Sequence, residues 1–124
     1  MRPNEEQEQA AVVDWCDLHG IPVVHIPNEG RRSAYTGANL KRMGMRPGFP
    51  DLFIPVARMG YHGLFVEMKV GKNKPTRAQI EWLRRLDAEG YAVCVRYGAD
   101  EAIGSIEFYM GGDNDRKKSA SGSP

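Results

Sequence analysis

The chain has 124 residues, the ordinary size of one domain, of which 41% are hydrophobic and 27% are charged. This composition argues against a disordered chain, and no apolar run approaches the roughly 20 residues that cross a bilayer, so we expect a soluble protein without a membrane partner. The net charge of +1 does not identify a partner, because an acidic site can cancel a basic surface in the total.

The N-terminal segment predicts a helix that ends near Leu18. Asn4 is a suitable N-cap, and acidic and amide residues fill the first turn, where the helix dipole favours negative charge. The apolar core of a secretory signal is missing here, so we expect a cytoplasmic protein. Residues 21–26 are rich in β-branched side chains and predict a strand. Residues 27–48 predict a long loop of the kind that is usually functional or mobile, with a short helix near residues 38–43.

The middle of the chain predicts a β-hairpin followed by a second long helix. Residues 51–56 and 63–70 are apolar-rich runs on either side of a glycine-containing turn. Thr76 and Gln79 have the spacing of a capping box, so we expect the helix to begin there and to stop at Gly90. The side chains of this helix that we expect to face the core are Ile80, Leu83 and Leu86.

The C-terminal part predicts one more strand, a short helix and a tail. Residues 91–97 have the pattern of a strand, and Asp100 is expected to cap the helix after it. Residues 111–124 have almost no apolar content, so we expect a disordered tail beyond a single domain of residues 1–110. The order helix, strand, strand, strand, helix, strand predicts an α/β sandwich with a central mixed sheet.

One strand carries charges where apolar residues are expected. Alternation along residues 63–70 puts Glu67 and Lys69 on one face, and the hairpin would bring Asp51 toward them. The two carboxylates, with the backbone carbonyl of Met68, suit Mg²⁺ or Mn²⁺, which prefer oxygen ligands. Lys69 would then face the nucleophile or a phosphate. The alternative is a Glu67–Lys69 salt bridge beside an Asp51 that only caps a turn.

The two cysteines and three histidines give no sign of another metal site. Cys16 and Cys94 lie in apolar segments without metal-type spacing, so we interpret them as reduced core thiols. His19, His25 and His62 are scattered along the chain and match no zinc motif.

Several short motifs occur in one order along almost the whole ordered chain. They are Glu5 with Gln9, Ile26-Pro27-Asn28 with Arg31, Leu40-Lys41 with Gly44, Gly48-Phe49-Pro50-Asp51-Leu52, Phe65-Val66-Glu67-Met68-Lys69, Gln79 with Trp82-Leu83, and Gly90-Tyr91. This series resembles the virus-type replication-repair nuclease (VRR-NUC) domain of the PD-(D/E)XK superfamily. The resemblance implies a restriction-endonuclease-like αβββαβ core and a metal-dependent endonuclease active on branched or flapped DNA. Short members that stand alone resemble homodimeric four-way-junction (Holliday junction) resolvases of phage or bacterial origin.

The resemblance also assigns further site residues. Its helix-one acid, a metal and catalytic residue, corresponds to Glu5, although Glu6 and Glu8 lie close enough to leave the choice open. Gln79 corresponds to the glutamine that approaches the active site from the second helix. Its alternative role in the capping box does not exclude this one.

Basic residues in two stretches are candidate contacts to the DNA backbone, because Lys and Arg bind phosphates without regard to sequence. They are Arg31, Arg32, Lys41, Arg46, Lys72 and Lys74. Tyr35 and Tyr61 are candidates to stack on an unpaired base, although loop aromatics more often pack locally.

Two other functions remain open from the sequence. One is a flap or fork nuclease of the same fold, and the other is a non-catalytic DNA-binding subunit. Loss of Asp51, Glu67 or Lys69 would be expected in the second, and all three are present. A junction resolvase of this size needs two active sites and is therefore expected to be a symmetric homodimer.

Overall fold

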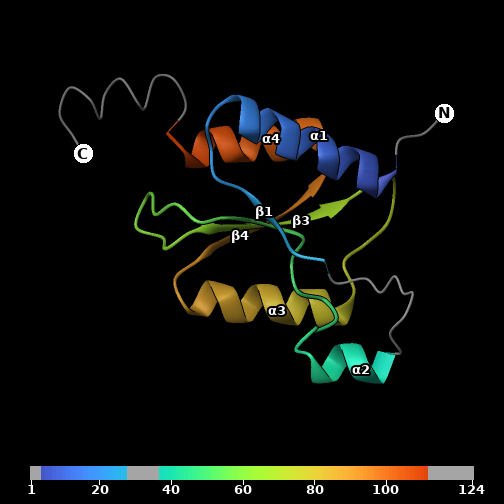
Figure 1. Ribbon diagram of the computed structural model, residues 1–124. Coiled ribbons are helices and arrows are strands. Elements are labelled where there is room, and N and C mark those ends of the chain that lie inside the picture. The colour runs from blue at the N-terminus through green and yellow to red at the C-terminus, as the bar shows by residue number, and fades with distance from the viewer. Residues whose placement is uncertain (1–3, 28–36, 112–124) are drawn as a thin grey trace.

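A computed structural model describes residues 4–27 and 37–111 (Figure 1). The predicted phosphate contacts Arg31 and Arg32, the candidate stacking residue Tyr35, and the predicted tail beyond residue 111 lie outside the described residues. Within the described ranges, no helix is both long enough and apolar enough to span a membrane.

The centre of the molecule is a four-stranded mixed sheet. Its strands are β1 (Val24–His25), β2 (Leu52–Ile54), β3 (Leu64–Lys69) and β4 (Ala92–Tyr97), and they lie side by side in that order. β1 with β2 and β2 with β3 are antiparallel, whereas β3 with β4 is parallel. The predicted hairpin and the predicted mixed sheet are both confirmed.

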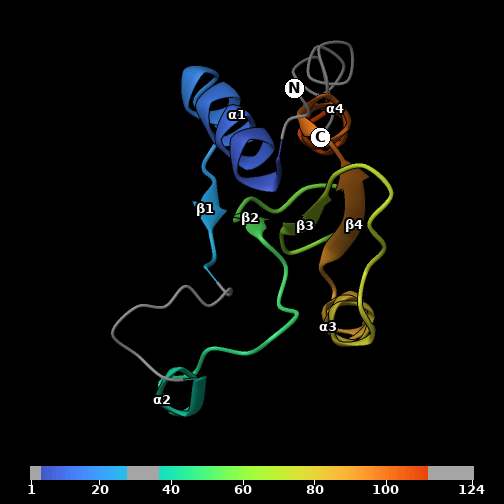
Figure 2. The same cartoon turned by 90° about the vertical axis from the view of Figure 1, so that its right-hand side faces the viewer.

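Helices cover the two faces of this sheet. α1 (Glu5–Leu18) and α4 (Ala99–Tyr109) lie on one face, and α3 (Arg77–Ala88) lies on the other (Figures 1 and 2). α2 (Gly37–Arg42) is on the same side as α3 (Figure 1). The predicted α/β class is therefore correct, with α4 as an element beyond the αβββαβ core.

Both faces of β3 are buried, and they contact different layers. The residues of β3 on the α1 and α4 side join an aliphatic core. That core includes Val12, Cys16, Leu52, Ile54, Leu64, Val66, Met68, Ala102 and Ile106. On the α3 side, Phe65 stacks on Phe53 with ring centroids 4.3 Å apart, and it meets Phe49 edge to face at 5.4 Å. Alternation along β3 thus sends Glu67 and Lys69 toward the α3 side, as the sequence predicts.

Cys16 is a buried free thiol of the aliphatic core, and Cys94 is free and half-buried against it. Both cysteines are therefore free thiols in or beside the core, as predicted. Burial raises the pKa of Cys16 to about 11, which keeps this thiol protonated and unreactive.

α4 begins differently from the prediction. Its N-cap is Gly98, which has no side chain to offer, and Asp100 lies inside the first turn, so the prediction that Asp100 caps this helix is wrong. The cap comes instead from α1, where Glu8 Oε1 accepts a hydrogen bond from the Ala99 backbone N–H at 2.6 Å. The helix is also longer than expected, with 11 residues.

Two further expectations need correction. The strand predicted over residues 21–26 is a strand only at Val24–His25, and the Ile26 backbone N–H makes one further hydrogen bond, to the Asp51 carbonyl at 2.8 Å. Ile80 is 40% exposed rather than in the core. The half-buried stripe of α3 runs through Gln79, Trp82, Leu83 and Leu86, so the polar Gln79 takes the inward position at the start of the helix.

Candidate active site

The side chains of Asp51 and Glu67 meet at the end of β3. Asp51 lies immediately before β2, and its Oδ2 accepts a hydrogen bond from the Met68 backbone N–H at 2.8 Å. Because Met68 lies between Glu67 and Lys69 in the chain, this bond anchors the Asp51 carboxylate beside both. Lys69 Nζ is 3.5 Å from Glu67 Oε2. The structure therefore brings together the three residues that the sequence pattern singles out.

These charges are removed from solvent to an unusual degree. Glu67 is 2% exposed and Lys69 is 7% exposed, and within residues 4–27 and 37–111 they are the only buried charged side chains. A buried charge is costly unless it is paired or binds a metal. The Glu67–Lys69 ion pair meets part of this cost, so the alternative considered from the sequence, a salt bridge, is also present.

Gln79 reaches the same place from α3. Its Nε2 donates a hydrogen bond to Glu67 Oε2 at 3.0 Å. Its Oε1 accepts from the Thr76 backbone N–H at 2.8 Å, and the Gln79 backbone N–H donates to Thr76 Oγ1 at 3.1 Å. The Gln79 side chain therefore completes the capping box of α3 and hydrogen-bonds to Glu67 at the same time.

Gly48 makes this approach of α3 possible. Its φ is +89°, in the left-handed region that favours glycine. A Cβ at this position would lie 2.7 Å from the backbone carbonyl carbon of Ala78. Only glycine allows the segment before Asp51 to pack this closely against the first turn of α3, which carries Gln79.

The site favours protonated carboxyls when it contains only protein. Burial, followed by the nearby charge of Asp51, raises the pKa of Glu67 to about 8, although Lys69 opposes the shift. Burial also raises the pKa of Asp51, against the hydrogen bond from Met68. Glu67 Oε1 is buried and has no hydrogen-bond partner. The two carboxyl groups nevertheless interact with each other, since each shifts the pKa of the other.

This donor set fits a hard divalent cation. Mg²⁺ is usually held by one or two carboxylates, and Asp51 with Glu67 supplies two. No group of three or more His, Cys, Asp or Glu side chains that could hold a metal is found in the described part of the chain. The predicted contribution of the Met68 carbonyl stays a prediction.

The three acidic residues at the start of α1 differ in their surroundings. Glu8 is committed to capping α4 through Ala99, as described above. Glu6 is exposed, whereas Glu5 is half-buried. The described residues contain no group of three acidic, His or Cys side chains that could hold a metal, so the assignment of Glu5 as a helix-one acid at the site stays a prediction.

Cationic side chains are exposed around the site. Lys41 on α2 and both Lys72 and Lys74 after β3 are exposed, and their role as phosphate contacts stays a prediction. Arg46 is also exposed, but its Nη1 donates to the backbone carbonyls of Lys41 at 2.8 Å and Met45 at 3.3 Å, so it also fixes the end of α2.

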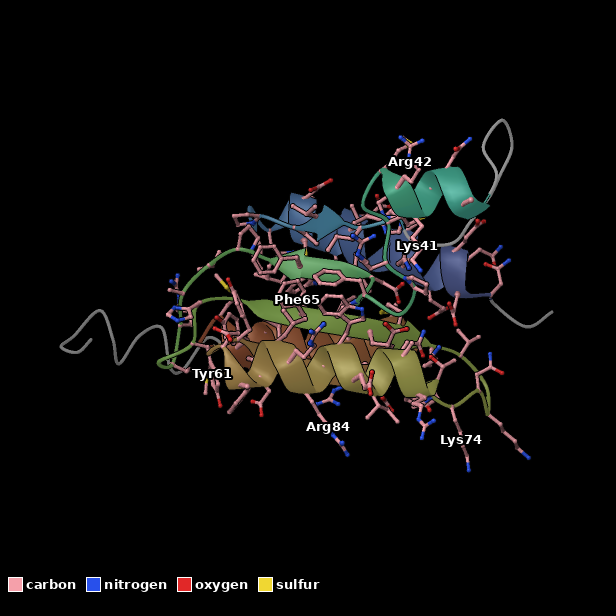
Figure 3. The ribbon with its side chains drawn as sticks, turned by 90° about the horizontal axis from the view of Figure 1, so that it is seen from below. Lys41, Arg42, Tyr61, Phe65, Lys74 and Arg84 are labelled. Carbon is pink, nitrogen blue, oxygen red and sulfur yellow. The ribbon has the colours of Figure 1, made fainter. Side chains whose placement is uncertain are left out.

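The sequence interpretation did not include the arginines in the second half of α3. Arg84 and Arg85 are exposed, and Arg85 Cζ lies 4.9 Å from the ring centroid of Trp82. Seen from below, Arg42 and Arg84 point to opposite sides of the molecule, with Lys41 between them (Figure 3). Arg84 and Arg85 lie outside the half-buried stripe of α3. This amphipathic pattern is the sequence signal that could have identified them as exposed cations.

Comparison with known proteins agrees with this geometry. The family model for the VRR-NUC domain matches residues 3–100. A solved structure named "VRR_NUC domain protein" is similar to this chain with a TM-score of 0.75 and 34% sequence identity, over 89% of this chain and 90% of that one. None of the curated proteins matches the chain.

Proposed function

Because the chain belongs to the VRR-NUC family, which implies a nuclease of the PD-(D/E)XK type, we propose that it is a metal-dependent endonuclease for branched DNA. Its preferred substrate in this proposal is a four-way junction, cut by a homodimer. The observation that carries the proposal is the buried pair of Glu67 and Lys69 beside Asp51, with one carboxylate oxygen left without a protein partner. We assign residues 1–110 to the nuclease domain and residues 111–124 to a tail.

In the proposed mechanism, Asp51 and Glu67 hold Mg²⁺ or Mn²⁺, with Glu5 and the Met68 carbonyl as further oxygen donors. When bound, such a cation would make a water a better nucleophile at neutral pH and would act as a Lewis acid toward the phosphate. Lys69, fixed beside Glu67 at 3.5 Å, orients the attacking water and offsets charge that develops on the scissile phosphate. Gln79 holds Glu67 in place through its 3.0 Å hydrogen bond.

The proposed binding surface recognises the shape of DNA rather than its base sequence. Lys and Arg contact phosphates of any sequence, because the DNA backbone carries the same charge at every step. We propose as phosphate contacts Arg31, Arg32, Lys41, Arg46, Lys72 and Lys74.

The proposal is tested with labelled four-way junction, flap, fork and linear duplex substrates in Mg²⁺ or Mn²⁺. Asp51→Asn is the informative variant, because the Asn oxygen can still accept the hydrogen bond from Met68 while the charge is lost. We expect it to cut the junction about 100-fold or more slowly than the wild type. Asp14→Asn, an exposed position on α1, is the matched control and should keep full activity.

Two outcomes would change the proposal. Equal cutting by the wild type and by Asp51→Asn would remove Asp51 from the mechanism. Faster cutting of flaps or forks than of junctions would replace the junction with the alternative substrate of the same fold.

A further inference from the structure

A cavity of about 460 Å³ is lined by residues of α2, of the segment between α2 and β2, and of α3, and the catalytic residues proposed above do not line it. We call it the aromatic pocket. Its main lining residues are Leu40, Met43, Met45, Arg46, Phe49 and Trp82. Phe49 lies two residues before Asp51, and Trp82 follows Gln79 by about one turn of α3. A group in this pocket would therefore lie next to the proposed point of cleavage.

The walls of the pocket suit a flat, aromatic ligand. Trp82 and Phe49 both line the pocket and meet edge to face with ring centroids 5.0 Å apart. The Arg85 guanidinium lies over the Trp82 ring but is not one of the lining residues. Met43 is 66% exposed, so a soft, polarisable side chain is open to solvent here. Planar bases stack on such rings whatever their sequence, because every base has a π face.

The rim of the pocket favours an anionic ligand. Arg46 lines the pocket, and its Nη1 also donates to two backbone carbonyls. Lys41 and Arg42 are not lining residues, but they follow the lining residue Leu40 on α2 and are exposed (Figure 3). A second copy of this chain would bring the same cations to the contact, and like charges would repel. A nucleotide combines a planar base with a negative phosphate, and so it matches both the walls and the rim.

We propose that the aromatic pocket receives one unpaired base of the DNA substrate, next to the scissile phosphate. The proposal rests on the proposed nuclease function and adds a source of substrate selection. A paired base must first be unstacked, whereas a base at a branch or bulge is already free or nearly so. The pocket would thus favour branched DNA over ordinary duplex without reading sequence.

A direct test uses Trp82 as the probe. The chain has two tryptophans, so Trp15→Phe, on the far face of the sheet, leaves Trp82 as the only one. This protein is titrated with a branched DNA that has one unpaired nucleotide at the branch, or with the same DNA carrying an abasic site there. A chelator prevents cutting. We expect the unpaired base to quench Trp82 fluorescence, and the abasic DNA to bind about 5- to 100-fold more weakly.

Variants of the pocket give a second, independent readout. Met43→Ala and Trp82→Leu should lose most of the preference for the base over the abasic site, measured by fluorescence anisotropy of labelled DNA. Met59→Ala, at a methionine that is 57% exposed on the hairpin turn, should keep the preference and is the matched control. If Trp82→Leu fails to fold, Met43→Ala still decides the question, since its side chain is mostly in solvent.

The outcomes separate this proposal from the nuclease function. Equal affinity and equal quenching with both DNAs would overturn the proposal that the aromatic pocket receives a base. The proposed cutting of junctions would be unaffected by this result. A base preference that remains in Met43→Ala and Trp82→Leu would also overturn it. A Trp82 signal that depends on protein concentration without DNA would instead assign the pocket to a second copy of the chain. Base preference without cutting of any branched DNA would refute only the nuclease function.

Discussion

Glu67 is a much weaker acid in the fold than an ordinary glutamate. Its pKa is about 8, against an ordinary value of 4.5, chiefly because of burial. Between these two values the folded chain keeps a proton that the unfolded chain releases, so the stabilisation from this group is complete below pH 4.5 and is lost as the pH rises to about 8. The raised pKa of Asp51 acts in the same direction.

We therefore predict that metal-free protein loses stability between pH 5 and pH 8, and that Glu67→Gln loses less. Gln stays neutral and can still accept the hydrogen bond from Gln79. The expected difference between the two proteins is on the order of a few kcal/mol in the free energy of unfolding, measured with urea in the presence of a chelator.

Glu6→Gln, at an exposed position, is the control for this comparison and should follow the wild type. If the free energy of unfolding changes with pH by the same amount in the wild type and in Glu67→Gln, Glu67 is already ionised at low pH in the folded state. Adding Mg²⁺ or Mn²⁺ at pH 8 should stabilise the wild type and have a much smaller effect on Glu67→Gln, because a bound cation favours the charged carboxylate.

At the scale of the element, α4 depends on a residue far away in the chain. Gly98 gives it no side-chain cap, and Glu8 of α1 provides one across 91 positions of sequence. The Gly98 N–H in turn donates to the Lys69 carbonyl at 3.0 Å, which ties the cap to the last residue of β3. The start of α4 and the end of the charged strand are therefore held by one set of contacts.

Replacing Glu8 by Ala should destabilise the fold by about 1–2 kcal/mol, since it removes both the cap and a negative charge near the N-terminus of a helix. Urea unfolding at pH 7 measures this loss in the free energy of unfolding. Glu6→Ala on the same turn is the control and should change stability much less. A loss of equal size in both variants would mean that helix propensity or the charge of α1, rather than the bond to Ala99, is responsible.

The cap of α4 also explains which features the sequence predicts well. Asp51 and Glu67 are placed together by strand alternation and one hairpin, both of which are local patterns. Asp100 was expected as a cap because caps are normally supplied by neighbouring residues. The actual acceptor, Glu8, depends on how α1 packs against α4, and no local pattern contains that information. The inward position of Gln79 likewise follows from Gly48 packing on α3.

At the scale of the whole molecule, the two edge strands of the sheet differ in length. β1 has only two residues, whereas β4 is an edge strand of six. Side chains cover part of β4, because Arg96 donates to the Val95 carbonyl at 2.7 Å and Glu101 accepts from the Tyr97 N–H at 2.9 Å. Such covered edges discourage pairing with another strand. We therefore do not expect a second copy to extend this sheet along β4.

A homodimer is nevertheless expected from the reaction itself. Resolving a four-way junction takes two cuts in opposite strands, and the described chain offers one set of Asp51, Glu67 and Lys69. A symmetric pair of chains supplies the second set. Sedimentation of the wild type with and without junction DNA should therefore show a dimer, and mixed dimers of wild-type and Asp51→Asn chains should make a single nick in each junction. Paired cuts by a protein that sediments as a monomer, or by the mixed dimers, would mean that one active site cuts both strands in turn.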